Sequence, residues 1–396
     1  MKLRMEANHR QPPNWLGKKR PIWLHASSGE FEYAKSVLRE IKQRAPLTPI
    51  LVTYFSPTYQ KNIANTPEVD WDEPLPLDTT AACRQFLRRF NPQVCLISRT
   101  DLWPEMLYQC GKRNLPVYLF SATFSGKKAR GIFSRLLARL LLPLVSEIFC
   151  VSEDDRSEIL HLLPQASVTA AGDTRYDQVL FRLSHKKDLK EELKPADPLR
   201  TMVGGSTWPE DEKVLLPALA PFIKDHGLHL ILAPHEPTTE HLKSLTSQLK
   251  DLGLTSCRYS EADHYPEGHV LIIDQVGILA DLYSWGRMAF VGGSFKGSVH
   301  SVMEPLGSGA VTLVGPDHQN NREALEFKHK ELGTNLHMVQ VCATRDEMAR
   351  VIDLLLESRD QIPQWSERIV DGVANKSGAS HAFVTALFTK TQLAPD

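Results

Sequence analysis

An acidic residue at the start of a predicted helix is the first candidate for chemistry in this chain. Glu30 follows the apolar run at 22–24 and a turn of small residues at 27–29, and apolar residues recur at helical spacing after it. Ligands of open α/β sheets bind at the carboxyl ends of the strands, where a carboxylate can act as a general base. Acidic residues are also common in the first turn of a helix, where they interact favourably with the helix dipole. The residues alone leave both roles open.

Four polar turns in the second half of the chain also follow predicted strands. They lie at 204–212, 233–237, 291–297 and 315–321 and carry small, polar and acidic residues. The backbone N–H groups of such turns can hold a phosphate. The turn at 291–297 does not fit the GxGxxG pattern and lies late in the chain, which argues against a nicotinamide-dependent dehydrogenase.

Short apolar runs alternate with helical patterns in both halves, and this alternation predicts parallel sheets with crossover helices. The strands expected in the first half are 22–25, 50–54, 94–98, 117–121 and 148–151. Those expected in the second half are 201–204, 229–233, 270–273, 288–291 and 311–314. The simplest architecture is a pair of doubly wound, Rossmann-like α/β domains that face a central cleft.

The domain boundaries are predicted from composition. The polar, charged and proline-containing segment 184–199 is typical of a linker. It separates an N-terminal domain at 1–183 from a C-terminal domain at 200–365. Residues 366–396 are expected to form helices that pack back toward the N-terminal domain.

Composition narrows the class of protein. The chain has 396 residues, of which 42% are hydrophobic and 23% charged, as in ordinary globular domains. Its apolar runs are far shorter than the roughly 20 residues of a membrane-spanning helix, and no N-terminal signal pattern is present. The cysteines and histidines show no metal-ligand spacing. We therefore expect a cytoplasmic protein with no metal.

Charge is distributed unevenly although the net charge is only −1. Residues 1–182 hold 25 Lys+Arg and 18 Asp+Glu, a charge of +7, and the remainder holds 21 and 29, a charge of −8. The first half therefore suits an anionic partner. Its densest basic segment, 127–139, has apolar residues between the charges and predicts a basic amphipathic helix that can lie on an anionic bilayer. An ordinary surface helix with its apolar face in the core has the same pattern.

A set of motifs, in order from about residue 20 to residue 325, resembles the Kdo transferase family. The motifs are Gly29-Glu30, Asp101-Leu-Trp-Pro104, Gly172-Asp-Thr-Arg-Tyr-Asp177, Gly205-Ser-Thr-Trp-Pro-Glu-Asp-Glu212, Asp274 with Gly277 and Leu279, and Val291-Gly-Gly-Ser294 through Glu304-Pro305. The resemblance implies a GT-B glycosyltransferase that moves 3-deoxy-D-manno-oct-2-ulosonic acid (Kdo) from CMP-Kdo to the lipid A precursor, lipid IVA, in lipopolysaccharide biosynthesis of Gram-negative bacteria. It implies a donor site on the C-terminal domain and an acceptor site on the N-terminal one.

The resemblance also implies roles for individual residues. Glu30 would be the general base of an inverting transfer, and Asp101 would orient Glu30 or the acceptor. The implied donor-binding residues are Arg175, Ser206, Thr207, His235, Gly277, Gly293, Ser294, His300, Glu304 and Asn320. The implied acceptor-binding residues are Ser28, Arg99, Lys127 and Arg130. CMP-Kdo is a substrate, so no cofactor is expected. The other expected partners are the lipid A precursor and the cytoplasmic face of the inner membrane. No binding to nucleic acid is expected.

The chain departs from the family pattern at several positions. Arg99 stands where the family more often has an acidic residue, and His235 stands where many members have an arginine. Ser298 to Ser301 replace a Gly-Gly-His-Asn motif, and the first residues are polar where members usually begin with a hydrophobic anchor. The alternatives are another GT-B nucleotide-sugar transferase or epimerase, or a non-catalytic lipid- or nucleotide-binding relative.

Overall fold

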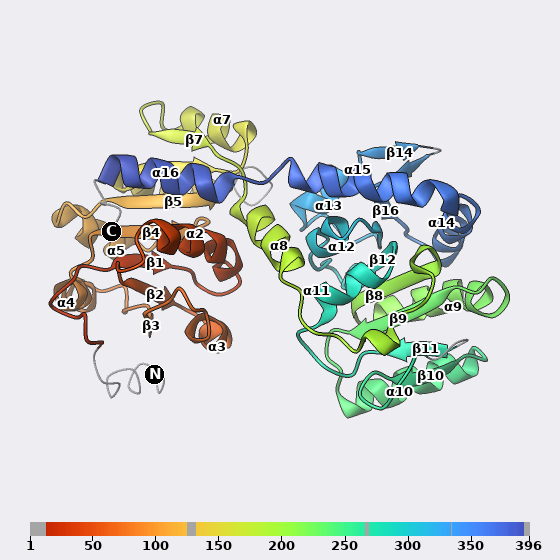
Figure 1. The fold of residues 1–396 in the computed structure, drawn as a ribbon. Coiled ribbons are helices and arrows are strands. Elements are labelled where there is room, and N and C mark those ends of the chain that lie inside the picture. The colour runs from red at the N-terminus through yellow and green to blue at the C-terminus, as the bar shows by residue number, and fades with distance from the viewer. Residues whose placement is uncertain (1–12, 125–131, 266–268, 334, 392–396) are drawn as a thin grey trace. The chain divides into compact units, whose positions relative to one another are not determined.

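The computed structural model describes residues 13–124, 132–265, 269–333 and 335–391. The chain divides into two compact units. The first consists of residues 1–178 together with 376–396, and the second of residues 179–375. Each unit has its own sheet (Figure 1).

The first unit is built on a seven-stranded parallel sheet in the order β3-β2-β1-β4-β5-β6-β7. The strands are β1 (Ile22–His25), β2 (Ile50–Tyr54), β3 (Trp71–Pro74), β4 (Val94–Ser98), β5 (Val117–Ala122), β6 (Glu147–Cys150) and β7 (Val168–Ala170). The order reverses between β1 and β4, and this switch point is where doubly wound sheets bind ligands. The central strands are buried throughout, as expected of a parallel sheet covered on both faces.

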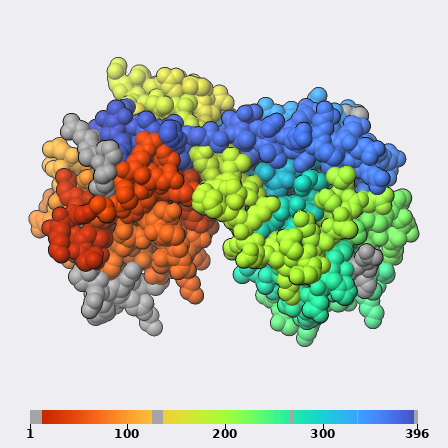
Figure 2. All heavy atoms as spheres, viewed as in Figure 1, coloured from red at the N-terminus to blue at the C-terminus, as the bar shows by residue number. Residues whose placement is uncertain are grey.

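Helices cover the first sheet, and the last helix of the chain is one of them. The helices are α2 (Phe31–Arg44), α3 (Gln60–Ala64), α4 (Thr80–Phe90), α5 (Pro104–Lys112), α6 (Ile132–Leu141), α7 (Glu153–Leu162), α8 (Thr174–Ser184), within which the second unit begins, and α16 (Ala379–Thr391). Phe383 of α16 packs against Phe120 and Phe149 at centroid distances of 5.1 and 5.0 Å. The blue atoms of α16 accordingly lie among those of the first unit (Figure 2).

The second unit repeats the same design. Its parallel sheet has the order β10-β11-β9-β8-β12-β13-β16, with the switch point between β8 and β12. The strands are β8 (Thr201–Thr207), β9 (His229–Pro234), β10 (Thr255–Arg258), β11 (His269–Ile272), β12 (Met288–Val291), β13 (Val311–Val314) and β16 (Val339–Val341), and β14 (Glu331–Gly333) pairs with β15 (Leu336–His337). The helices are α9 (Pro209–Asp225), α10 (Thr239–Asp251), α11 (Leu279–Leu282), α12 (Met303–Gly307), α13 (Arg322–Phe327), α14 (Arg345–Glu357) and α15 (Ile362–Ala374).

The prediction of two doubly wound α/β sheets is confirmed, and all ten expected strands form within a few residues of their expected bounds. The segment 184–199, predicted to be a linker, belongs to the second unit, where Leu193 is buried in the core. The part of the chain that returns to the first unit begins at Lys376. Within the described part of the chain, no helix combines the length and apolarity that crossing a membrane requires.

Gly292, directly after β12, allows two strand-end loops to approach closely. A Cβ atom at this position would lie 2.2 Å from the carbonyl oxygen of Ser206 and 2.6 Å from the Cα of Thr207. Because both atoms belong to backbone, the replacement Gly292→Ala is expected to lower the free energy of unfolding by about 1–3 kcal/mol, measured by urea denaturation. Gly111→Ala is the matched control: a Cβ there meets nothing within 4 Å in helix α5, so stability is expected to stay unchanged or rise slightly. Equal stability of the two variants would contradict the close approach.

Candidate functional site

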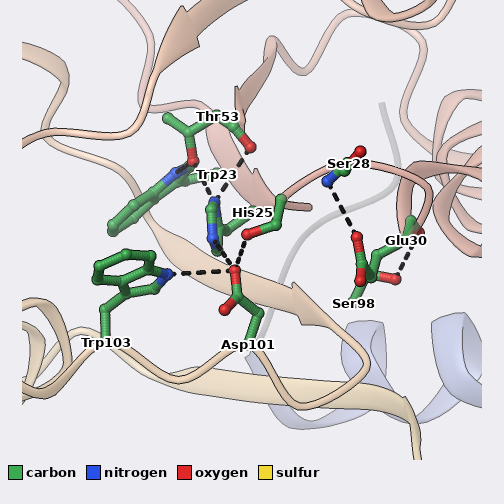
Figure 3. A network of polar contacts seen from close by, with 9 residues as sticks. Trp23, His25, Ser28, Glu30, Thr53, Ser98, Asp101 and Trp103 are labelled. Atoms are coloured by element: carbon green, nitrogen blue, oxygen red, sulfur yellow. Dashed lines mark hydrogen bonds and ion pairs between the residues drawn. The ribbon is translucent and has the colours of Figure 1, made fainter. Parts of the chain in front are cut away.

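Glu30 lies at the N-terminus of α2, just beyond the carboxyl end of β1 (Figure 3). Its carboxylate oxygen Oε2 accepts a hydrogen bond of 2.9 Å from the backbone N–H of Ser28. Its own carbonyl oxygen accepts a 2.7 Å hydrogen bond from the Ser98 hydroxyl at the end of β4. No described residue donates to Oε1, and the side chain is partly exposed. Glu30 is therefore fixed at the switch point of the first sheet with one carboxylate oxygen open.

A buried histidine beside Glu30 joins the ends of three strands (Figure 3). His25, the last residue of β1, has its Nε2 atom 2.8 Å from Oδ2 of Asp101. Its Nδ1 atom lies 3.1 Å from the carbonyl oxygen and 3.0 Å from the hydroxyl of Thr53. The same hydroxyl accepts a hydrogen bond of 2.8 Å from the indole of Trp23. Since an ionised carboxylate only accepts hydrogen bonds, Nε2 of His25 carries a proton.

Asp101 is held by three donors at a single oxygen. In addition to His25, the hydroxyl of Ser27 and the indole of Trp103, the latter at 3.1 Å, donate to Oδ2. Burial opposes ionisation of this carboxyl, but the hydrogen bonds and the charge of His25 outweigh it and hold the pKa of Asp101 below its ordinary value. Asp101 is thus an ionised, preorganised group whose second oxygen receives no hydrogen bond from the described residues.

Two arginines of the first unit each pack against the ring of Tyr33. The guanidinium carbons of Arg99 and Arg175 lie 4.6 and 5.6 Å from the ring centroid of Tyr33. Arg175, a predicted donor-binding residue, therefore lies in the first unit and contacts the same ring as Arg99, a predicted acceptor-binding residue.

The strand-end loops of the second unit bring together an aromatic cluster. The indole N–H of Trp208 donates a 3.1 Å hydrogen bond to Nε2 of His300. The ring of His235 stacks on both, with centroid distances of 4.7 Å to Trp208 and 4.3 Å to His300. The ammonium of Lys296 lies 3.1 Å from the centroid of the Trp208 ring, a cation–π contact.

The Trp208 hydrogen bond determines the state of His300. An acceptor Nε2 means that the proton of the neutral ring is on Nδ1. Burial, reinforced by the charge of His235, lowers the pKa of His300 to about 4. His300 is therefore a neutral hydrogen-bond donor at physiological pH, and Lys296 contributes a positive charge to this cluster.

Removing the indole donor is expected to change the titration of His300. In Trp208→Phe the aromatic ring remains, but Nε2 loses its donor and becomes free to take a proton, so the pKa of His300 should rise above about 4. Burial and the charge of His235 remain in the variant and should still hold this pKa below its ordinary value. The measurement is an NMR titration of the histidine Cε1 protons between pH 4 and 8. In the wild type His300 should stay neutral above pH 5. A pKa near 4 in the variant would show that the indole hydrogen bond has no such effect.

Asp211 ties two loops of this cluster together. Its fully buried carboxylate accepts backbone hydrogen bonds from Trp208 at 2.9 Å, Gly293 at 2.7 Å and Phe295 at 3.0 Å. Burial still raises its pKa despite these three donors. The sequence presents Asp211 only as an acid in the first turn of a helix, so its bridging role was missed.

The remaining predicted donor residues lie around the same edge of the second sheet, and several are engaged within the fold. The hydroxyl of Thr207 donates to buried Glu212 at 2.8 Å, and that of Ser294 donates to the carbonyl of Val291 at 3.0 Å; both side chains are fully buried. The others are Ser206, Gly277, Gly293, Glu304 and Asn320. Ser206 has a positive φ of 53°. The carboxylate of Glu304 accepts a hydrogen bond from the hydroxyl of Ser301, and the side-chain amide of Asn320 donates to and accepts from the backbone of Val299.

Two predicted acceptor residues, Lys127 and Arg130, lie outside the described residues. Within the described ranges, no group of three or more His, Cys, Asp or Glu side chains could hold a metal ion. The pairing of His25 with Asp101 and the cluster at Trp208 were not predicted. The signal in the sequence was that His25 ends an apolar strand and Trp208 directly follows a strand that ends in small residues.

Comparison with known proteins finds a matching family model and relatives that carry the same name. Residues 3–178 match the family model described as 3-deoxy-D-manno-octulosonic-acid transferase (kdotransferase). The enzyme of that name from Rickettsia felis is 27% identical over 76% of this chain, which spans 65% of the relative's length. The Haemophilus influenzae enzyme is 27% identical over 86% of this chain and 80% of its own length.

Solved structures show the same fold at low sequence identity. The UDP-GlcNAc 2-epimerase from Neisseria meningitidis, bound to UDP-GlcNAc, has a TM-score of 0.66 and 15% identity, covering 94% of this chain and 100% of its own. The UDP-GlcNAc 2-epimerase from Methanocaldococcus jannaschii has a TM-score of 0.59 and 14% identity, covering 90% and 99%. The fold class is GT-B, with two Rossmann-like parallel sheets.

Proposed function

We propose, from the match of residues 3–178 to the Kdo transferase family model, that the chain is an inverting glycosyltransferase of this family that moves Kdo from CMP-Kdo to the lipid A precursor. The names of its relatives support Kdo transfer. The donor CMP-Kdo, the acceptor lipid IVA, inversion at the anomeric carbon and the residue roles below are part of the proposal.

The observation that carries the proposal is the geometry of Glu30. One carboxylate oxygen is fixed by the N–H of Ser28, and the other is open at the switch point of the first sheet. In the proposed reaction this oxygen takes the proton of the acceptor hydroxyl while the hydroxyl oxygen attacks the anomeric carbon of Kdo. The new C–O bond forms as the bond to CMP breaks on the opposite face, so the configuration inverts.

Asp101 and His25 support this step from the adjacent strand ends. The carboxylate of Asp101 is fixed through Oδ2 by three donors, which leaves Oδ1 to orient the acceptor. Preorganised groups of this kind do not have to rearrange when the reaction occurs.

The second unit is proposed to bind CMP. Its loops after β8 and β12 lie at the switch point, where dinucleotide-binding sheets also hold their ligands. Lys296 supplies a positive charge and His300 a neutral N–H donor to the nucleotide. Glu304 would bind the ribose hydroxyls, and the loop at Gly277 would line the cytosine.

The first unit is proposed to work on the cytoplasmic face of the inner membrane. Leu136 and Leu140 of α6 are 56% and 64% exposed. Exposed leucines on a basic helix favour contact with an anionic lipid surface that holds the acceptor.

A single reaction tests the proposal. The full chain is incubated with CMP-Kdo and lipid IVA, and the product is analysed by mass spectrometry; we expect CMP release together with lipid that carries added Kdo. A parallel reaction with UDP-GlcNAc tests the epimerase alternative. No Kdo on the lipid, with or without conversion of UDP-GlcNAc, would overturn the proposal.

A further inference from the structure

Arg99 has an unusual backbone for an arginine. Its φ of 66° lies in the left-handed region, which costs a non-glycine residue of order 1–3 kcal/mol and persists only where the surrounding structure enforces it. Its N–H donates to the carbonyl of Phe120 on the neighbouring strand at 2.9 Å. Such residues cluster at ligand-binding sites because the strained backbone directs a side chain that relaxed geometry would place elsewhere.

The side chain of Arg99 has unused donors. It packs on the face of Tyr33 and has an ionic contact of 3.8 Å with Asp173, but it donates no hydrogen bond of ordinary length to any described residue. A guanidinium offers five N–H donors in a planar fork that fits a carboxylate or a phosphate. Its side chain is 28% exposed, so these donors are accessible.

A buried network holds the backbone next to Arg175 against Tyr33. Thr174, the residue before Arg175, donates from Oγ1 to the carbonyl of Tyr33 at 2.6 Å, and its N–H donates to the hydroxyl of Ser121 at 3.0 Å. The hydroxyl of Ser36 donates to the carbonyl of Thr174 at 2.9 Å. The backbone positions of Tyr33 and Arg175 are therefore fixed relative to each other.

The charge of this cluster is positive. Asp173 is buried and accepts the N–H of Arg175 at 2.9 Å through Oδ1, while its Oδ2 faces Arg99. The one carboxylate of Asp173 therefore faces the guanidinium of Arg99 and the backbone of Arg175. The cluster also adjoins Glu30, because Arg99 follows Ser98, whose hydroxyl bonds to the carbonyl of Glu30, and Tyr33 lies one turn into the helix that Glu30 begins.

We propose that Arg99 and Arg175, with Tyr33 between them, form a binding site for an oxyanion of the substrate, next to Glu30. This inference rests on the proposed function for the source of the anion: a phosphate of the lipid acceptor or the carboxylate of the transferred sugar acid. In either case the arginines fix the substrate so that the reacting hydroxyl or the anomeric carbon lies near the open oxygen of Glu30.

Inorganic phosphate is the probe for direct binding. The full chain is titrated with phosphate, and the NMR resonances of the Tyr33 ring report binding at this site, so that phosphate bound elsewhere is not counted. The Kd at this site should rise about 10- to 100-fold in Arg99→Gln and in Arg175→Gln. Arg88→Gln, which removes an equal charge from an exposed position on α4, should keep the wild-type Kd. No response of Tyr33 in the wild type, or an equal Kd in Arg99→Gln, would overturn the site.

Kinetics identify the source of the anion. If it is an acceptor phosphate, Arg99→Gln should raise the KM for the phosphorylated lipid about 10- to 100-fold and have little effect with a dephosphorylated one. If it is the sugar carboxylate, the donor KM should rise equally with both lipids. If the wild type transfers Kdo and Arg99→Gln has the same kinetic constants, the anion site is wrong and the proposed function stands. If the wild type transfers no Kdo but binds phosphate at Tyr33, the proposed function is wrong and the anion site stands.

Discussion

Glu30→Gln is expected to lower kcat for Kdo transfer about 10²- to 10⁴-fold, the usual contribution of a general base. The amide keeps the size of the side chain and its oxygen can still accept the hydrogen bond from Ser28, so the turn and helix α2 should remain intact. An amide cannot take the proton of the acceptor hydroxyl. The KM values for donor and lipid should change little, because the residue acts on the transition state.

Glu32→Gln provides the control on the same helix. Glu32 also lies in the first turn of α2, but its carboxylate is paired with Lys35 at 2.7 Å. Its replacement should leave kcat within about twofold, since an ion pair between residues i and i+3 of one helix contributes little. If Glu30→Gln retains kcat within a few-fold of the wild type, Glu30 is only a helix-capping residue and the base must be sought elsewhere.

The central strands of both sheets could be predicted from the sequence because they are continuous apolar runs. The strands that were missed include β3, β7, β10 and β16, all four of which are the outermost of their sheets and none of which is fully buried. An outer strand needs fewer apolar residues, so its sequence resembles that of a loop. The polar strand Thr255–Arg258 is an example.

The candidate site was predictable only in outline. Strand ends place Glu30 and Asp101 at one edge of a parallel sheet, but the pairing of His25 with Thr53 depends on register. His25 stands beside Thr53 of β2 on one side and Ile97 of β4 on the other. A shift of one residue would turn the histidine to the other face, and no local pattern specifies that register.

Contacts between distant loops were even less accessible from the sequence. Trp208 and His300 are 92 positions apart and meet because Asp211 binds the backbone of both loops. The left-handed backbone of Arg99 has no signal in its residue type. Such features depend on the packed fold, and they are the ones that distinguish this site from an ordinary strand-to-helix turn.

Asp101→Asn is expected to destabilise the first unit at neutral pH by about 1–3 kcal/mol, because buried His25 loses its charged acceptor. The pKa of Asp101 is lowered in the folded protein, so its stabilising contribution is present above the ordinary value of about 3.9 and is lost as pH falls through the lower folded value. The difference in stability between wild type and variant should therefore be largest near pH 7 and shrink below pH 4. Urea denaturation at several pH values measures it.

The same substitution separates a positioning role from a purely structural one. Asp154→Asn, an exposed acid in the first turn of α7, is the control and should change neither activity nor the pH dependence of stability by much. If Asp101 also orients the acceptor, Asp101→Asn should lower kcat/KM about 10- to 100-fold at temperatures where the variant is fully folded. A stability difference that is independent of pH would contradict the ionised state of Asp101, because only a charged carboxylate makes the contribution disappear on acidification.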